Sequence, residues 1–132
     1  MRFRYGMDEP IQVLAGTGGV ALGEARTNHD GRKAVLLHRD GNPSELIALA
    51  ETMGIEILDV QYQKGSEDPR SYFGKGRLQD VADEISSAVE GHPWHGVDLV
   101  IIHSNASPRQ LVNVHESVQV EVWDRVRLLL WD

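Results

Sequence analysis

Apolar residues occur along this chain in short continuous runs that alternate with stripes at helical spacing. The continuous runs lie at residues 34–38, 55–62, 97–103 and 118–123. Such runs are typical of strands that are buried on both faces of a sheet. The stripes between them indicate helices that bury one face. This alternation predicts an α/β domain, with a mostly parallel sheet of about four strands joined by right-handed crossover helices.

Two of the expected helices carry recognisable start signals. Asn42 is expected to be the N-cap of the first helix, with Pro43 at its first position and Glu45 at its third. Gly54 is expected to end this helix in a left-handed conformation. Residues 107–110, Ser-Pro-Arg-Gln, predict a capping box at the start of the last crossover helix.

The apolar stripes also predict which helical side chains are buried. They are Leu46, Leu49, Ala50 and Met53 in the first helix, Leu78, Val81, Ala82, Ile85 and Val89 in the second, and Leu111 and Val114 in the third. The regular pattern begins at residue 33, so residues 33–132 are expected to form one α/β domain. Residues 1–32 are rich in glycine and are expected to form an extension or an edge element.

In parallel sheets of this kind, ligands bind at the loops that leave the carboxyl ends of the strands. The corresponding loops here are residues 39–42, 63–76 and 103–107. All three are expected on one edge of the sheet, beside three helix N-termini. Helix N-termini attract anions, so the sequence predicts an anion-binding edge.

Composition narrows the classes of function. The net charge of −7 argues against generic coating of nucleic acid, although a local basic patch remains compatible with phosphate contact. The absence of cysteine excludes disulfides and thiolate metal sites, and fits a cytoplasmic location. No stretch approaches the length of a membrane span, and no secretory signal precedes the domain.

Several candidate chemistries are incomplete. The glycines of residues 16–19 lack the lysine of a phosphate-binding P-loop. His92 and His95 have no third metal ligand nearby. His103 and Ser104 are adjacent on an expected strand, so their side chains point to opposite faces and do not form a nucleophilic pair. We therefore expect no catalytic residue, no metal site and no enzyme activity in this chain alone.

The most informative segment is residues 63–77, which is locally basic. Its charged residues are Lys64, Arg70, Lys75 and Arg77 against Glu67 and Asp68, a local charge of +2. Tyr72 and Phe73 lie among these charges, an arrangement that suits contact with RNA phosphates and bases. The other interpretation is a solvated loop whose aromatic side chains fold back into the core.

The last residues, 126–131, form an apolar run. An exposed run of this kind requires a partner surface. It is expected either to pack as a final helix or strand, or to pair with a following domain or with a second copy in a homodimer.

Several segments together are similar to one known family. They are residues 46–54 (LIALAETMG), 68–78 (DPRSYFGKGRL), 98–101 (DLVI), 107–111 (SPRQL) and 122–130 (VWDRVRLLL). In this order and spacing they resemble the N-terminal domain of the HflX family of ribosome-associated GTPases. Arg77 replaces a usual lysine and Val126 a usual threonine.

The resemblance implies a module of a larger protein. In the family, this domain contacts the large ribosomal subunit and its RNA, and ATP binding has been attributed to it in some members. A helical hairpin and a GTPase domain that binds GTP and Mg²⁺ follow it, and neither is expected within this chain. No cofactor is expected in the chain itself, with ATP as the alternative.

The family motif D-P-x-x-Y-x-G-x-G falls on the basic loop. Glycines at positions 74 and 76 would let the backbone approach a phosphate closely, and the neighbouring cations would neutralise it. The expected RNA-binding or nucleotide-phosphate-binding residues are Lys64, Arg70, Tyr72, Gly74, Lys75, Gly76 and Arg77. Three functions follow as hypotheses: docking on ribosomal RNA, binding of ATP at the same loop, and protein interaction through the apolar C-terminus.

Overall fold

The structure is a computed structural model of the chain and describes residues 29–131. Predictions that fall on residues 1–28 lie outside the described residues. The elements are β2 (Lys33–His38), α2 (Ser44–Thr52), β3 (Glu56–Tyr62), α3 (Lys75–Ser87), β4 (Leu99–Ile102), α4 (Pro108–Val118), β5 (Glu121–Trp123) and α5 (Arg125–Trp131). No helix in this range is long and apolar enough to cross a membrane.

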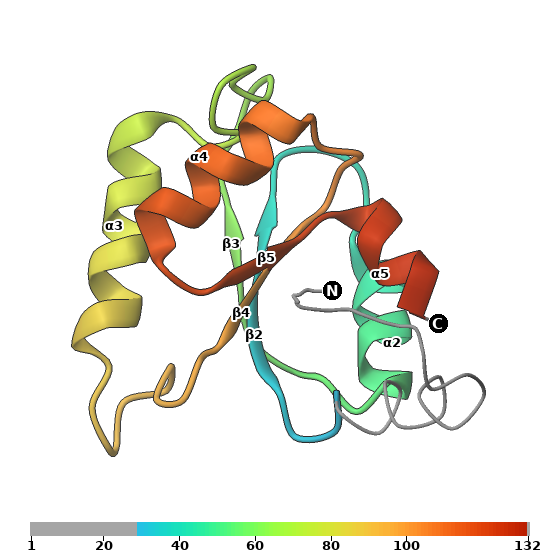
Figure 1. Ribbon diagram of the computed structural model, residues 1–132, viewed down its shortest axis with the longest axis vertical. Helices are drawn as coiled ribbons and strands as arrows, with labels where there is room; N and C mark the ends of the chain where they lie inside the picture. The colour runs from blue at the N-terminus through green and yellow to red at the C-terminus, as the bar shows by residue number, and fades with distance from the viewer. Residues whose placement is uncertain (1–28, 132) are drawn as a thin grey trace, which may run out of the picture.

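The predicted parallel α/β architecture is confirmed. The four strands form one sheet in the order β3-β2-β4-β5, and all three neighbouring pairs are parallel. Helices α3 and α4 cover one face, and α2 and α5 cover the other (Figure 1). Val35 and Leu37 of β2 face the first pair of helices, and Ala34 and Leu36 face the second. Burial on both faces explains why β2 is an uninterrupted apolar run.

Between β2 and β5 the strand order reverses once. From β2 the chain passes through α2 to β3 on one side, and then returns through α3 to β4 on the other side of β2 (Figure 1). The carboxyl ends of β2 and β4 therefore flank a topological switch point. Crevices at such points are the preferred ligand sites of open α/β sheets.

The ends of α2 agree with the sequence at one terminus only. Asn42 is not the N-cap, because the helix begins at Ser44 and Pro43 occupies the cap position. The Asn42 side chain instead accepts the Ser44 N–H at 3.0 Å and forms a local turn. At the other end Gly54 has φ 86°, as predicted. Its N–H donates to Glu51 O, and the Ile55 N–H donates to Ala50 O, which together form a Schellman cap.

Two apolar residues lie in different elements from those predicted. Helix α3 ends at Ser87, where the backbone becomes extended, so Val89 follows the helix and is 71% exposed. Val118 is the last residue of α4 and not the start of a strand. Gln119 takes a left-handed conformation with φ 61°, and this separates α4 from β5.

Strand β3 forms one edge of the sheet and contains an irregularity. Ala34 pairs with Ile57 and Val35 pairs with Asp59, so Leu58 is an extra residue in the ladder. Next to this bulge, Asp59 Oδ1 accepts the Val60 N–H at 2.8 Å. The Asp59 side chain thus occupies a main-chain donor of the edge strand.

Candidate functional site

The three loops at the carboxyl edge of the sheet contact one another, as the topology predicts. The Tyr72 hydroxyl, from the loop after β3, donates to the main-chain oxygen of His103 after β4, at 3.3 Å. The Glu67 carboxylate accepts from the Ser104 hydroxyl at 3.1 Å and from the Gln110 side chain at 3.0 Å. The capping box predicted for α4, between Ser107 and Gln110, is confirmed at this edge.

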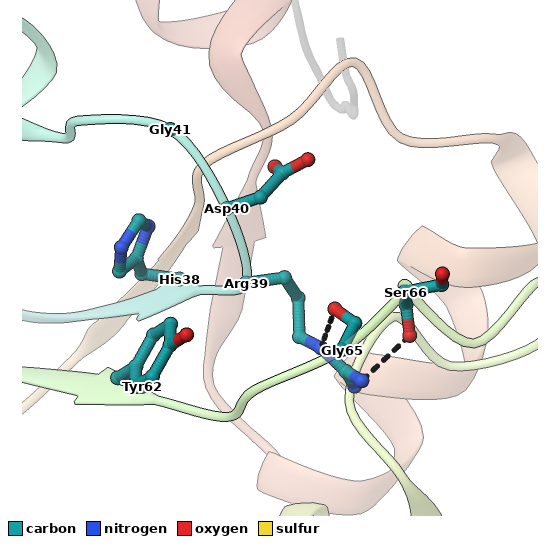
Figure 2. Close-up of a pocket in the computed structure, with 7 residues that line it drawn as sticks. All are labelled: His38, Arg39, Asp40, Gly41, Tyr62, Gly65 and Ser66. Atoms are coloured by element: carbon teal, nitrogen blue, oxygen red, sulfur yellow. Dashed lines mark hydrogen bonds between the residues drawn. The ribbon is translucent and has the colours of Figure 1, made fainter.

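Arg39, immediately after β2, organises the basic loop. Its side chain is buried, with 8% of the residue exposed, and its guanidinium donates five hydrogen bonds. The acceptors are Gln63 Oε1 and the main-chain oxygens of Lys64, Gly65, Ser66 and Tyr72, at 2.6–3.3 Å. Figure 2 shows Arg39 reaching Gly65 and Ser66. The sequence interpretation missed Arg39. Its sequence signal was a cation directly after a strand whose central residues are all apolar.

Both aromatic residues of the loop lie in the core. Tyr72 and Phe73 are fully buried and stack with ring centroids 5.8 Å apart. The Tyr72 backbone has φ 65°, a value that residues other than glycine rarely adopt. Burial raises the pKa of the Tyr72 phenol. The buried ring of Tyr72 therefore holds the loop against the core and does not face solvent.

The motif residues around Tyr72 form a closed turn. Asp68 and Tyr72 exchange two main-chain hydrogen bonds of 2.8 Å. Asp68 Oδ1 also accepts the N–H groups of Arg70, at 2.7 Å, and Ser71, at 3.3 Å. The first of these bonds is the main reason why the pKa of Asp68 lies below its usual value. The turn fixes Arg70 on the outer side of the loop.

The two motif glycines differ in their surroundings. The Gly74 N–H donates to Gln63 Oε1 at 2.8 Å, and a Cβ at this position would lie 3.1 Å from Gln63 Nε2. Gly76 lies in the first turn of α3, and a Cβ there would meet nothing within 4 Å. Close packing accounts for glycine at 74, whereas nothing in the described chain requires it at 76.

The four predicted cations divide into two groups. Lys64, Arg70 and Lys75 are exposed. Arg77 is partly buried, donates to Tyr62 O and Gln61 Oε1 at 2.9 Å each, and lies over the Phe73 ring. It cross-links α3 to the end of β3.

Arg70 and Lys75 lie together at one hollow, and Lys64 is not part of it. The volume is about 490 Å³, and the hollow lies between the basic loop, α3 and α4. Its lining residues are Asp68, Arg70, Ser71, Lys75, Leu78, Gln79, Asn113, Glu116 and Ser117.

A second hollow, of about 670 Å³, opens at the end of β2. Its lining residues are His38, Arg39, Asp40, Gly41, Tyr62, Gly65 and Ser66 (Figure 2). His38 Nδ1 lies 3.3 Å from Nδ1 of His103, which directly follows β4. Burial, followed by the nearby His38 and Arg125, lowers the pKa of His103. The sequence interpretation considered His103 with Ser104 alone, and the Ser104 hydroxyl donates to Glu67.

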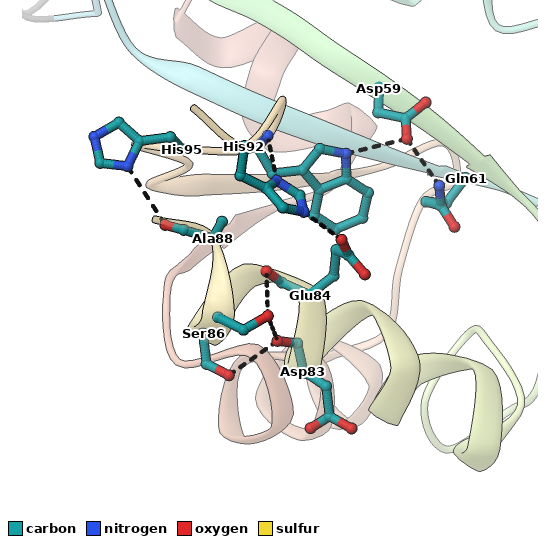
Figure 3. Close-up of polar contacts among 10 residues, drawn as sticks. Asp59, Gln61, Asp83, Glu84, Ser86, Ala88, His92 and His95 are labelled. Carbon is teal, nitrogen blue, oxygen red and sulfur yellow. Dashed lines mark hydrogen bonds and ion pairs between the residues drawn. The ribbon is translucent and has the colours of Figure 1, made fainter. Parts of the chain in front are cut away.

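The other two loop histidines have local partners. His92 Nε2 pairs with Glu84, and its Nδ1 accepts the Trp94 N–H at 2.9 Å (Figure 3). His95 Nδ1 lies 3.4 Å from Ala88 O. Between residues 29 and 131, no three histidine or acidic side chains converge to hold a metal ion.

Comparison with known sequences points to one family. The sequence profile of GTP-binding GTPase N-terminal domains matches residues 41–131. GTPase HflX of Caldanaerobacter subterraneus subsp. tengcongensis is 32% identical over 88 residues, which are 66% of this chain and 19% of that protein. GTPase HflX of Thermococcus kodakarensis is 29% identical over 87 residues, 66% of this chain and 18% of that protein. The chain thus spans about a fifth of the length of these relatives.

Solved structures share the fold. A crystal structure of SsGBP with GDP superposes with a TM-score of 0.60 at 22% identity, over 76% of this chain and 28% of that one. A GTP-binding protein from Sulfolobus solfataricus in complex with GDP gives a TM-score of 0.58 at 20% identity, over 76% and 29%. The profile match covers most of the α/β domain, including the Asp68–Tyr72 turn and the α4 capping box. The chain therefore belongs to the family of GTP-binding GTPase N-terminal domains that is found in GTPase HflX.

Proposed function

We propose that this domain is the ribosome-docking module of an HflX-type GTP-binding protein, and that it binds phosphates of ribosomal RNA through Lys64, Arg70 and Lys75. One observation carries the proposal: Arg39 clamps the basic loop from inside while these three cations remain exposed. A loop that is already ordered loses little conformational entropy on binding. Phosphate contacts supply most of the affinity of such interfaces.

The local field at the loop favours an anion. Lys75 is the first residue of α3, and no acidic residue lies in the first turn of this helix. The positive end of the helix dipole therefore adds to the charges of Arg70 and Lys75. The domain is acidic as a whole, with a net charge of −7, so attraction to RNA is confined to this edge.

The other motif residues shape the loop in this proposal. Arg77 cross-links α3 to β3, Tyr72 anchors the turn, and Gly74 permits the close contact with Gln63. Substitution of these residues would disturb the fold together with binding. The cleanest tests therefore use Lys64, Arg70 and Lys75, which are all exposed.

The test is cosedimentation of the chain with purified large ribosomal subunits at low and moderate salt. We expect pelleting that falls steeply with salt, and the triple variant Lys64→Ala, Arg70→Ala, Lys75→Ala should weaken it and reduce the salt slope by roughly one for each lost contact. Lys33→Ala is the matched control, because Lys33 begins β2 at the opposite edge of the sheet. Equal pelleting of the triple variant and the wild type, or no pelleting of the wild type, would contradict the proposal.

Gly76 offers a sharper probe of the same interface. A Cβ at position 76 meets open space, so Gly76→Ala should preserve the fold and stabilise α3 by about 0.5–1 kcal/mol. If a phosphate approaches the backbone here, this variant should bind the large subunit less tightly in spite of its greater stability. Unchanged binding would mean that the phosphates contact the side chains of the loop and not its backbone at residue 76.

ATP is the second candidate ligand at this loop. The hollow that Arg70 and Lys75 share lies within the volume range of small-ligand sites, and its wall includes Leu78, Gln79 and Asn113. In this case ATP should bind with a measurable heat by calorimetry and should compete with the large subunit. Arg70→Ala should abolish the heat, whereas Lys33→Ala should leave it intact.

We further propose that α5 contacts the neighbouring helical and GTPase domains of the parent protein, or a second copy of the chain. The observation in favour is the exposure of three apolar side chains on this helix, which is 44% for Val126, 52% for Leu129 and 77% for Leu130. Exposed apolar groups at this density mark interaction surfaces. GTP and Mg²⁺ would bind in the GTPase domain, and a cytoplasmic location fits ribosome docking.

A further inference from the structure

His38 ends β2 and His103 directly follows β4, the two strands that flank the topological switch point. Their side chains lie on the same face of the sheet, and their Nδ1 atoms are 3.3 Å apart. From this geometry we propose that His38 and His103 together bind a divalent transition metal ion, beside the hollow at the end of β2 that His38 lines. The site is distinct from the basic loop residues proposed to contact RNA.

The separation of the two nitrogens suits one shared ion. In tetrahedral zinc sites the Zn–N distance is about 2.0–2.1 Å, which places two ligand nitrogens about 3.3 Å apart. The two rings are tilted by 49°, and their centroids are 5.3 Å apart. Both nitrogens can therefore approach the same ion with small ring rotations and no movement of the strands.

Neighbouring groups contact both histidine rings. The Asp40 backbone hydrogen-bonds to the His103 ring. Without an ion, one of the two facing Nδ1 atoms donates a proton to the other, and an ion would replace that proton. Support of the second ring nitrogen by a carbonyl is the usual arrangement of metal-bound histidine. The Tyr62 ring packs against His38, with centroids 5.1 Å apart.

The hollow leaves room for further ligands. It has a volume of about 670 Å³, and the Asp40 carboxylate stands at its rim (Figure 2). Two histidines fill half of a tetrahedral shell, so water or an external oxygen donor would complete the coordination. The Arg39 charge does not oppose the ion strongly, because five carbonyl and amide oxygens surround its guanidinium. Two protein ligands imply an exchangeable ion.

The test uses the tag-free chain after treatment with a chelator, titrated with Zn²⁺ by calorimetry and with Co²⁺ by visible absorption. We expect one ion per chain and a Co²⁺ spectrum of low coordination number. His38→Gln and His103→Gln should each weaken binding at least as much as loss of an outer-shell partner does, which is about 10–100-fold. His95→Gln is the matched control, because His95 is exposed and lies in a different loop.

A second measurement does not depend on variants. With histidine labelled by ¹⁵N, addition of Zn²⁺ should shift the ring signals of His38 and His103 and leave those of His92, His95 and His115 in place. No saturable binding, equal binding by the His38→Gln, His103→Gln double variant, or a shift confined to the other histidines would each overturn the proposal. The pair would then be a simple hydrogen bond between two rings. RNA docking is measured separately, so either proposal can fail alone.

Discussion

A single buried guanidinium determines the shape of the loop after β3. Arg39 donates five hydrogen bonds to that loop, and all five acceptors are uncharged. Burial of a cation costs free energy unless its donors are satisfied, and here oxygen dipoles surround it. The planar shape of the guanidinium is more important for the shape of this loop than its charge, because its donors point in several fixed directions.

Arg39→Lys should therefore destabilise the domain even though it keeps the charge. One ammonium group cannot reach all five acceptors that surround the guanidinium, and we expect a loss of about 2–3 kcal/mol in the free energy of unfolding. Urea denaturation gives this value. Arg109→Lys, at an exposed position on α4, is the control and should change stability by less than about 0.5 kcal/mol. Equal stability of the two variants would mean that the loop holds its shape without Arg39.

His29 makes stability depend on pH. Burial, followed by the nearby Arg32, lowers the pKa of its ring to about 4 from an ordinary value of 6.5, and the ring packs edge-on against Trp123. The His29 ring is protonated near pH 6.5 in the unfolded chain, but only near pH 4 in the folded chain. The contribution of His29 is thus fully present above pH 6.5 and is lost as the pH falls to about 4.

This window can be separated from ordinary acid denaturation. Asp68 and Glu121 have lowered carboxyl pKa values, so their contributions are lost at more acidic pH. Urea denaturation at several pH values should show a slope between pH 4 and 6.5 in the wild type that is flatter in His29→Gln. An identical slope in both proteins would show that His29 is not the titrating group.

At the scale of the elements, local signals differ in how well they predicted the helix ends. The capping box of α4 and the left-handed Gly54 after α2 were both predicted correctly, because each depends on contacts within a few residues. The N-terminus of α2 was predicted one residue too early. Asn42 can satisfy a main-chain N–H either as a cap or as a local turn, and sequence alone does not separate the two.

Ser107→Ala tests the capping box of α4. The Ser107 hydroxyl accepts the Gln110 N–H at 3.1 Å, and the Gln110 side chain accepts the Ser107 N–H at 2.9 Å. Loss of this cap should lower the free energy of unfolding by about 1 kcal/mol. Ser86→Ala is the control, because Ser86 is exposed and bonds to a carbonyl within its own helix. The idea fails if both variants unfold at the same urea concentration.

The parts that sequence could not predict depend on distant contacts. Arg39 meets acceptors 24–33 positions away, and His38 meets His103 65 positions away. The burial of Tyr72 and Phe73 follows from the same distant packing, so the mixture of aromatic and basic residues left two interpretations open. Val118 looked like strand because it is β-branched and apolar, and the left-handed Gln119 that ends α4 has no sequence signal comparable to glycine.

At the scale of the whole molecule, the exposed cations of the basic loop and the most exposed apolar side chains of α5 lie on different elements. The exposed cations of the basic loop are at the carboxyl edge of the sheet, whereas the exposed apolar side chains of α5 are on the helix that follows β5. Electrostatic contacts weaken with salt and apolar contacts do not. Two kinds of association, one that salt weakens and one that it does not, are therefore expected from one domain.

Leu130→Glu should remove the association that does not weaken with salt. Leu130 is 77% exposed, so the change should leave the free energy of unfolding nearly unaltered while it reduces self-association or domain association. Sedimentation velocity over a range of protein concentrations and salt gives the result. Val112→Glu, at a 54% exposed position on α4, is the matched control and should behave as the wild type. Unchanged sedimentation of Leu130→Glu would show that α5 is not an interface.

The bulge in β3 has a consequence for how the domain meets other molecules. An open sheet normally offers its outer strand as a template on which foreign chains can stack, which is how many fibrils grow. Here the extra residue Leu58 interrupts the ladder, and Asp59 takes up the Val60 N–H and adds a charge at the rim. The outer edge of β3 is thus a poor template for pairing with a strand of another molecule. Contacts with partners are expected to use loops and helices instead.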